Sequence, residues 1–346
     1  MAYSTISKPS LHFNTKLYTG NASTQAITGV GFQPDWTWIK NRSTTNSHVL
    51  TDAVRGVDKT LITNSNGAEN AGSTNIGSFD SDGFTLGSNG GTNGSGNSVV
   101  SWNWKAGTGQ GSSNTDGSIN TTYTSVNTTA GFSISSYTGT GSAGTIGHGL
   151  GSTPKMIIVK KRSGAANWYT YHQSLGNDKR LSLNETDASA TDNNAWNQTT
   201  PTSSVFSVGA SGTTNASGAT TIAYCFAEKK GYSKIGSYIG NGNANGAFVY
   251  TGFKPAWVMI KYINAGEGWI IHDNRRNGFN PDNDFLYANT NGAEVSSTHL
   301  DILSNGFKTR STNGVVNGNG NTYIYLAFAE EPLVANVGAS VPATAR

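Results

Sequence analysis

A short apolar run that opens with proline and closes with lysine occurs three times along the chain, at residues 34–40, 154–160 and 255–261. Between the two end residues each run contains mainly aromatic and aliphatic side chains. A short apolar run of this kind is consistent with a buried β-strand, and proline is tolerated at the first residue of a strand. The pattern therefore predicts one buried strand that is repeated three times.

Further anchor residues surround each run in the same order. A tyrosine with a glycine two positions later precedes each proline, while a phenylalanine follows about 50 residues on and a terminal aromatic residue about 70 residues on. The three sets of anchors are Tyr18, Gly20, Phe84 and Trp104; Tyr137, Gly139, Phe206 and Phe226; and Tyr238, Gly240, Phe307 and Phe328. Ordered self-similarity of this kind indicates a repeated unit. We therefore expect three homologous copies, at residues 16–105, 130–228 and 229–330.

The turn signals favour an all-β fold. Asn-Gly and Asp-Gly dipeptides, which suit tight hairpin turns, divide the first repeat at Asn66-Gly67, Asp82-Gly83 and Asn93-Gly94. No window shows a sustained helical spacing of apolar residues. Many short strands with regular turns are typical of β-sandwiches and barrels. We predict three tandem antiparallel β-sandwiches of the jelly-roll type.

Three segments lie outside the repeats. Residues 1–15 are expected to be an arm that docks on a partner or on the first repeat. Residues 106–129 have the Gly, Ser, Thr and Asn content of a linker, with one strand expected around residues 119–126. This long connection predicts a hinge beside the first repeat, whereas the short connection between repeats two and three predicts fixed packing. Residues 331–346 are interpreted either as an extended partner-binding arm or as a frayed end.

The composition supports a folded protein and limits its partners. Only 12% of residues are charged and 44 are glycine, but 35% are hydrophobic and 10% aromatic, which is too much apolar side chain for a disordered chain. The net charge of +3 is spread along the chain, so no basic cluster suggests binding to nucleic acid or to an anionic membrane. The single cysteine, Cys225, excludes an internal disulfide and is expected to be a packed thiol.

The first residues show no basic region followed by an apolar core, so no secretory signal is predicted. No apolar run is long enough for a membrane-spanning helix. We therefore expect a soluble protein made in a cytoplasm. If it acts outside a cell, a route other than ordinary secretion must bring it there.

Candidate catalytic side chains are sparse. Each repeat carries a histidine 14 to 18 residues after its proline, namely His48, His172 and His272. Three copies of one position favour a structural hydrogen bond over catalysis or metal binding. The acidic residues form no recognisable pair of the kind that glycoside hydrolysis requires. The sequence therefore predicts a non-enzymatic protein without cofactor or metal, with polysaccharide hydrolysis as the least favoured alternative.

A lectin-like site is the main alternative to a purely structural role. The loop 66–69, Asn-Gly-Ala-Glu, recurs at 291–294, and Asn184-Glu185 stands near the equivalent place in the second repeat. Carbohydrate sites combine such polar side chains with an aromatic platform. The candidate glycan-binding residues are Asn66, Glu69, Trp168, Tyr169, His172, Trp196, Trp269, His272, Asn291 and Glu294. The competing interpretation is that the Asn-Gly pairs form turns and the tryptophans belong to the core.

Several sequence segments resemble those of a known protein family. They are residues 31–42, residues 147–150 together with the run 154–160, and residues 306–308 together with 327–330. The chain resembles, over nearly its whole length, uncharacterised virion proteins of tailed bacteriophages, especially marine phages of cyanobacteria and other open-ocean bacteria. The resemblance implies a concanavalin-like or jelly-roll β protein in a tail fibre, in another appendage or on the capsid as a decoration. It implies no catalytic residues.

On this basis we expect a structural virion protein that is exposed on the particle. Its β repeats and terminal arms would bind other virion proteins and further copies of the chain as a homo-oligomer. A host-surface glycan is the alternative partner, whereas nucleic acid and membrane are not expected. Assembly in the host cytoplasm and release by lysis would explain the missing secretory signal.

Overall fold

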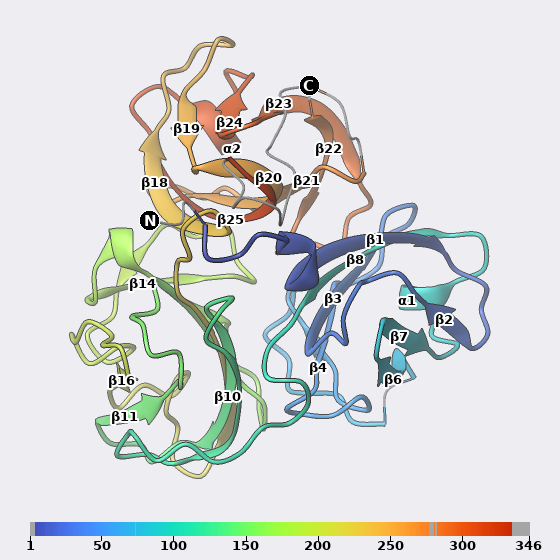
Figure 1. Ribbon diagram of the computed structural model, residues 1–346. Coiled ribbons are helices and arrows are strands. Elements are labelled where there is room, and N and C mark those ends of the chain that lie inside the picture. The colour runs from blue at the N-terminus through green and yellow to red at the C-terminus, as the bar shows by residue number, and fades with distance from the viewer. Residues whose placement is uncertain (1–3, 73, 277–279, 281, 334–346) are drawn as a thin grey trace.

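The computed structural model is an all-β protein, with 44% of residues in strands and 4% in helices. It describes residues 4–72, 74–276, 280 and 282–333. The helices are single short turns: η1 (Pro9–Leu11), α1 (Gly90–Asn93), η2 (Gln173–Leu175) and α2 (Gly314–Asn317). Figure 1 shows three groups of strands arranged around a common centre. The strands pair antiparallel, as the sequence predicts.

The first strand set forms a five-stranded sheet in the order β1-β8-β3-β4-β5 and a small sheet in the order β2-β7-β6. Its strands are β1 (Phe13–Thr19), β2 (Gln25–Ile27), β3 (Trp36–Asn41), β4 (Val49–Asp52), β5 (Leu61–Ile62), β6 (Ile76–Asp80), β7 (Gly83–Leu86) and β8 (Ser98–Trp104). Of the three predicted hairpin turns, Asp82-Gly83 joins β6 to β7. Asn93 instead ends α1, and Asn66-Gly67 lies in the loop after β5.

The second set forms a seven-stranded sheet in the order β15-β14-β13-β12-β17-β10-β9 and a pair, β11-β16. Its strands are β9 (Thr121–Asn127), β10 (Phe132–Thr138), β11 (Gly144–Gly147), β12 (Met156–Lys161), β13 (Tyr169–His172), β14 (Lys179–Ser182), β15 (Ala190–Thr191), β16 (Val205–Val208) and β17 (Thr220–Phe226). The strand expected around residues 119–126 is confirmed as β9, which pairs with β10 at the edge of the main sheet.

The third set forms one eight-stranded sheet in the order β18-β25-β20-β21-β22-β23-β24-β19. Its strands are β18 (Ser233–Ile239), β19 (Phe248–Tyr250), β20 (Phe253–Tyr262), β21 (Trp269–Asp273), β22 (Asp282–Tyr287), β23 (Val295–Leu303), β24 (Gly306–Thr309) and β25 (Thr322–Pro332). All three main sheets contain the same strand order: β1-β8-β3-β4-β5, β10-β17-β12-β13-β14 and β18-β25-β20-β21-β22.

The three proline runs form buried central strands, as predicted. β3 and β12 begin two residues after Pro34 and Pro154, and β20 contains Pro255. In each set the residue two positions after the proline lies opposite the terminal aromatic anchor. These pairs are Trp36 with Trp104, Met156 with Phe226, and Trp257 with Phe328. The three prolines therefore begin corresponding elements.

The tyrosine and glycine anchors connect β1, β10 and β18 to the turn before the last strand of each set. Each tyrosine hydroxyl donates to a backbone carbonyl directly before a buried asparagine. The bonds join Tyr18 to Thr92, Tyr137 to Thr214 and Tyr238 to Val316, at 2.6–2.7 Å. A Cβ at Gly20, Gly139 or Gly240 would lie 2.3–2.4 Å from a backbone oxygen, so a larger residue does not fit. The amides of Asn93, Asn215 and Asn317 then donate to the loops that follow these glycines.

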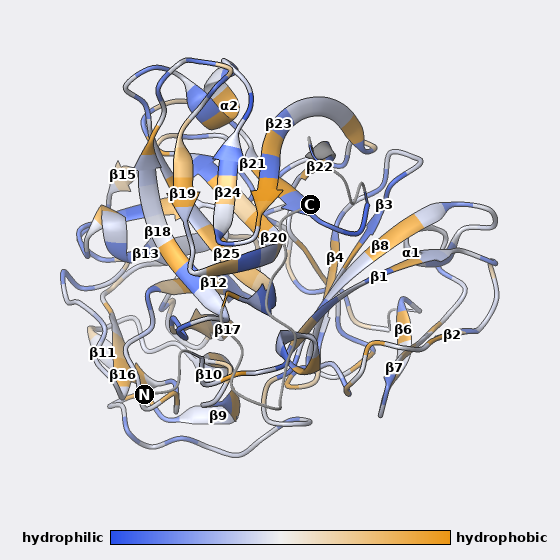
Figure 2. Ribbon diagram, turned by 45° about the horizontal axis from the view of Figure 1, so that its top comes forward, coloured by the Kyte–Doolittle hydropathy of each residue, from blue (hydrophilic) through white to orange (hydrophobic). Residues whose placement is uncertain are grey.

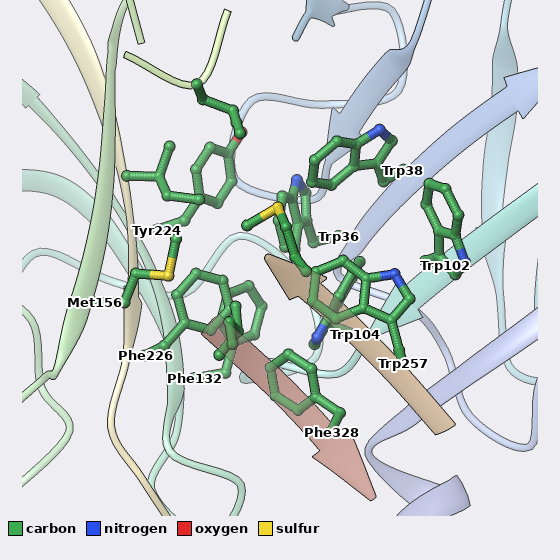
Figure 3. Close-up of a cluster of buried hydrophobic side chains, with 14 of the residues drawn as sticks. Trp36, Trp38, Trp102, Trp104, Phe132, Met156, Tyr224, Phe226, Trp257 and Phe328 are labelled. Atoms are coloured by element: carbon green, nitrogen blue, oxygen red, sulfur yellow. The ribbon is translucent and has the colours of Figure 1, made fainter. Parts of the chain in front are cut away.

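The largest hydrophobic core lies where the three main sheets meet. Trp36 stacks on Tyr224 with ring centroids 4.8 Å apart, and Phe328 contacts Trp104 at 5.7 Å and Phe226 at 6.1 Å. Figure 3 shows these rings converging from ribbons of all three sets. Figure 2 shows hydrophobic residues concentrated in the strands and polar residues in many of the peripheral loops. The three sets are therefore joined by one shared aromatic core.

Polar contacts between the sets repeat around this core. They join the Tyr224 hydroxyl to Asp52 at 2.7 Å, the Trp102 indole N–H to Asp273 at 2.9 Å, and His172 Nε2 to the Tyr325 carbonyl at 3.4 Å. Asp52, His172 and Asp273 occupy the same register, opposite the residue two positions after the proline. Each set therefore contacts both of the others, in the same rotational sense.

The N-terminal arm packs across the joint between sets rather than on the first set alone. Ile6 is buried in the shared core, and Phe13, with which β1 begins, stacks on Phe328 of the third set at 5.2 Å. The His12 ring meets the edge of Tyr232, also in the third set, at 5.9 Å. The arm is thus part of the fold in the described residues.

The predicted hinge beside the first set is wrong. Asp35 accepts backbone hydrogen bonds from residues 106, 108 and 109, which fixes the start of the linker. The first set also shares the central core with both other sets. Of the predicted tail 331–346, the first two residues belong to β25, while residues 334–346 lie outside the described part of the chain.

Candidate functional site

The tryptophans predicted to form a glycan platform belong to the interior. Trp168, Trp196 and Trp269 are each at most 1% exposed. Trp168 donates its indole N–H to the Ile62 carbonyl of the first set, and Trp269 donates to the Ser182 carbonyl of the second, both at 3.0 Å. Two of the three therefore join neighbouring sets, and none presents an open aromatic face.

Trp196 and Tyr169 belong to the second set itself. Trp196 donates to the Lys179 carbonyl at 3.1 Å and meets the edge of Tyr171. Tyr169 is half-buried beneath the Arg180 guanidinium, which lies 4.4 Å from the ring centroid. A sugar could not stack on this face of Tyr169 without displacing the arginine.

The two Asn-Gly-Ala-Glu loops lie at contacts between sets. Glu69 accepts hydrogen bonds from Arg162 of the second set at 2.8 and 2.9 Å and from Arg55 at 3.1 Å. Glu294 is held in the same way by Arg42 of the first set and by Arg276. Burial alone would raise the pKa of Glu69, but the two guanidinium groups hold it below its usual range. These carboxylates are therefore committed to ion pairs.

The sequence suggests that Asn184 corresponds to Asn66 and Asn291, but the structure aligns it with other residues. Asn66 and Asn291 are exposed, and their backbone carbonyls accept from Ala166 and Asn46 of neighbouring sets. Asn184 does not match them. Its side-chain oxygen accepts a hydrogen bond from the backbone N–H of Trp168 at 2.8 Å. Asn64 accepts in the same way from the backbone N–H of His48, and Asn289 from that of Trp269. The second set therefore lacks an Asn-Gly-Ala-Glu loop at the corresponding place.

The three histidines do not share one position, so that prediction is wrong. His172 matches Asp52 and Asp273 in register, whereas His272 is one residue earlier in its strand. His48 matches Trp168 instead, because each backbone N–H is bound by the corresponding asparagine. All three imidazoles are fully buried, and burial lowers the pKa of His172 to about 4 and that of His272 to about 3. His172 lies at a joint between sets, whereas the His272 ring packs against Phe285 and His299 within the third set.

The lysines that close the proline runs are also buried in the joints. Lys160 Nζ donates to the Asn66 carbonyl of the first set at 3.2 Å, and Lys261 Nζ donates to the Thr186 carbonyl of the second at 3.1 Å. Burial lowers the pKa of Lys40, Lys160 and Lys261 to about 8 each. The repeated lysine therefore neighbours the aromatic core without forming an open nucleophile.

Other reactive groups are similarly enclosed. Cys225 is fully buried, and burial raises the pKa of its thiol. In the described part of the chain no group of three or more His, Cys, Asp or Glu side chains is placed to hold a metal ion. No helix in the described residues is long and apolar enough to cross a membrane.

An exposed aromatic pair lies instead on the edge strand β19. Phe248 and Tyr250 are 48% and 57% exposed, while Val249 between them is buried. Alternate residues of a strand point to opposite faces, so both rings lie on the outer face. Lys308 of β24 pairs with Phe248 across the strands and donates its Nζ to the Asn245 side chain at 2.5 Å. Ile239, at the end of β18, is 65% exposed.

The corresponding strands of the other sets lack this pair. Ile27, Ile146 and Val249 are equivalent, because each lies opposite a predicted phenylalanine anchor. The flanking residues are Ala26 and Thr28 in the first set and Thr145 and Gly147 in the second. We call Phe248, Tyr250 and Lys308 the β19 face.

The family model described as a domain of unknown function, DUF7483, matches residues 8–332. The chain belongs to the DUF7483 family. That single match spans all three strand sets, from η1 to the last residue of β25. No curated protein and no solved structure gives a significant match.

The β19 face of this DUF7483 chain is not among the residues predicted from the sequence, because an exposed strand of three residues has only a weak sequence pattern. The signal is the alternation Phe248-Val249-Tyr250, in which a small apolar residue separates two aromatic ones. Aligning the three repeats on their phenylalanine anchors would have placed this triplet opposite small residues in the first two repeats.

Proposed function

We propose that the chain is a structural protein of a bacteriophage particle, exposed there as part of a tail fibre, another appendage or a capsid decoration. It consists of three tandem copies of one β-sandwich module of the jelly-roll or concanavalin-like type. It is assembled in the host cytoplasm and binds a neighbouring protein of the particle through the β19 face. The family resemblance of the repeated phrases supports the phage assignment.

The repetition of contacts supports three copies of one module. The strand order, the pairing of the terminal aromatic and the tyrosine hydroxyl bond each occur three times. The joints between the copies are also related by rotation about the shared core. A module duplicated twice and closed into a ring accounts for all of these features together.

The contacts made by the buried carboxylates, histidines and lysines support a structural role. Buried carboxylates such as Asp52 and Asp273 pair with arginines three residues later, at 2.5 and 2.7 Å. The buried histidines are neutral and the repeated lysines serve the joints. The chemistry inside the described chain therefore holds the three copies in one rigid arrangement.

The β19 face carries the docking part of the proposal. Large exposed apolar side chains gathered on one sheet face mark sites of protein interaction. Aromatic residues are enriched at the centres of such interfaces, where they bury a large area with few rotatable bonds. β19 is also the last strand of its sheet, so its outer edge offers backbone groups to a partner.

Particle composition tests the proposal. In an infection that supplies the chain only in epitope-tagged form, we expect the tag in density-purified particles, both by mass spectrometry and by gold-labelled antibody on intact particles. Replacing Phe248 and Tyr250 with serine should lower incorporation about tenfold or more, as expected when interface anchors are removed. The matched control replaces Ala26 and Thr28 with serine at the corresponding places of the first copy and should be incorporated normally.

Absence of the tag from purified particles would contradict the virion role. Normal incorporation of the Phe248 and Tyr250 variant would show that another surface docks. Self-association of the purified chain, measured by light scattering and lost in the same variant, would identify a second copy as the occupant of the β19 face.

A further inference from the structure

A hollow opens at the outer end of the first copy, beside β4 and β5. Its volume is about 360 Å³, near the lower end of the range for small-molecule sites. Its polar lining is uncharged and consists of Asn46, Ser47, Thr60, Asn70, Asn75 and Asn89. Val49 and Ile62 add an apolar side.

The other two copies place larger side chains at most of the positions that line this hollow. The strand register matches Val49, Thr60 and Ile62 with Tyr169, Arg180 and Ser182 in the second copy and with Ile270, Phe285 and Tyr287 in the third. In the second copy the Arg180 guanidinium covers Tyr169. In the third, Phe285 packs against Tyr287 at 5.3 Å and against His299 at 4.6 Å. The first copy has Val49 and Thr60 where the second has Tyr169 and Arg180 and the third has Ile270 and Phe285. At the last position Ile62 is smaller than Tyr287, although it is larger than Ser182. The space of the first copy remains open.

The polar wall of the hollow is held in place from behind. Asn75 is 6% exposed, donates its amide to the Thr60 hydroxyl at 3.2 Å and accepts from the Thr92 hydroxyl at 3.1 Å. The Asn46 backbone N–H donates to the Asn291 carbonyl of the third copy at 3.0 Å. A wall fixed in this way loses little conformational freedom when a ligand binds.

We propose that this hollow binds the pyranose ring of a neutral carbohydrate. Amide and hydroxyl groups both donate and accept hydrogen bonds, as sugar hydroxyls do. The C–H face of the ring packs against Val49 and Ile62, while the absence of charge in the lining gives an ionic ligand no partner. Recognition of a surface glycan would rest on the proposed exposure on the particle. The binding itself is independent of the β19 face, which lies on another copy.

Saturation-transfer NMR on the full chain tests this proposal with glucose, galactose, mannose and N-acetylglucosamine as probes. We expect transfer to at least one sugar, with a Kd of about 1 mM or tighter. Ile62→Tyr introduces the side chain that the third copy carries and should raise this Kd at least about tenfold, equivalent to about 1.4 kcal/mol. Ile239→Tyr makes the same substitution at an exposed position outside the hollow and should leave the Kd unchanged.

Absence of transfer to all four sugars overturns the proposal. Equal sugar binding by the Ile62→Tyr variant overturns the location, and tighter binding of glucuronate than of glucose overturns the preference for neutral ligands. If circular dichroism shows that Ile62→Tyr is unfolded, Val49→Tyr, which copies Tyr169 of the second module, replaces it. Particle incorporation of these variants should be normal, so a failure here is distinct from a failure of the structural role.

Discussion

The inner joints of the three strand sets, which we propose to be copies of one module, resemble one another, whereas their outer ends differ. At the inner joints each module presents an aromatic strand, a buried lysine and a polar group that contacts the next module. At the outer ends the first module has an open polar hollow, the second a cation stacked on a tyrosine, and the third an aromatic filling and the β19 face. The difference indicates that the joint fixes the architecture and leaves the outer ends free to acquire separate roles.

The largest expected effect comes from breaking the aromatic joint. Trp104 contacts Trp36, Trp257 and Phe328, with centroid distances of 4.4, 5.6 and 5.7 Å. Trp104→Ala should lower the free energy of unfolding by about 4 kcal/mol, because a large buried ring is removed and a cavity remains. Tyr250→Ala, which removes an exposed ring, should change it by no more than about 0.5 kcal/mol. Urea unfolding followed by fluorescence measures both.

The wild-type chain should unfold in one cooperative transition, because the core is shared among the modules. Three separate transitions, or equal effects of the two ring deletions, would show that the modules are stable individually and that the joint contributes little.

The second prediction concerns the polar group at the joint. Burial alone would raise the pKa of Asp273, but Arg276 and the Trp102 indole N–H hold it below its usual range. Asp273→Asn removes the charge that pairs with Arg276 at 2.7 Å and leaves Glu294, at 2.9 Å, as its remaining carboxylate, which should cost about 3 kcal/mol of unfolding free energy. The matched control is Asp58→Asn, since Asp58 forms an exposed pair with Lys59, which solvent screens, and its loss should have far less effect. A loss as small as the control's would mean that the buried pair does not hold the joint.

The sequence predicted the inner strands well because a buried strand leaves a local pattern. The proline runs and the terminal aromatics fall opposite one another as three equivalent pairs. The joints were not predicted, because they depend on contacts between distant residues: the Trp168 indole meets a carbonyl of the first module. Asn93-Gly94 has the local signature of a hairpin turn. The side-chain amide of the buried Asn93 instead donates a hydrogen bond to the Ser23 carbonyl. The hollow arises from small side chains, which carry no positive sequence signal.

The third prediction uses pH to compare the joints. The second module has His172 where the other two have aspartate, and burial lowers its pKa to about 4. Below pH 6.5 the unfolded chain takes up a proton at this residue that the folded chain does not bind, so stability falls as the pH decreases from about 6.5 towards 4. Above pH 6.5 neither state binds the proton, and this contribution is constant.

Replacing His172 with glutamine should remove about 2 kcal/mol of the stability loss between pH 8 and pH 5, the value expected for one histidine with these two pKa values. Urea unfolding at a series of pH values measures the slope. An unchanged slope in the variant would show that His172 is protonated in the folded protein.

The smallest effect tests whether the outer turns of the modules are still equivalent. The Asn89 side chain accepts the Gly91 N–H at 2.8 Å, and the Asn313 side chain accepts the Val315 N–H at 2.9 Å. Both asparagines precede a single helical turn that ends at a buried asparagine. Asn89→Ala and Asn313→Ala should each cost about 1 kcal/mol, the usual contribution of such a cap. In the second module Ser211 accepts from Thr213 at 3.2 Å, and Ser211→Ala should cost about the same or less.

Equal losses would indicate that divergence at the outer ends is confined to the side chains beyond the caps. A loss at Asn89 that exceeds the loss at Asn313 by about 1 kcal/mol or more would show that this residue also supports the hollow of the first module, because the two caps have the same backbone geometry. Comparing the losses of Asn89→Ala and Asn313→Ala therefore shows whether the Asn89 turn has the same structural role as the Asn313 turn or also supports the hollow.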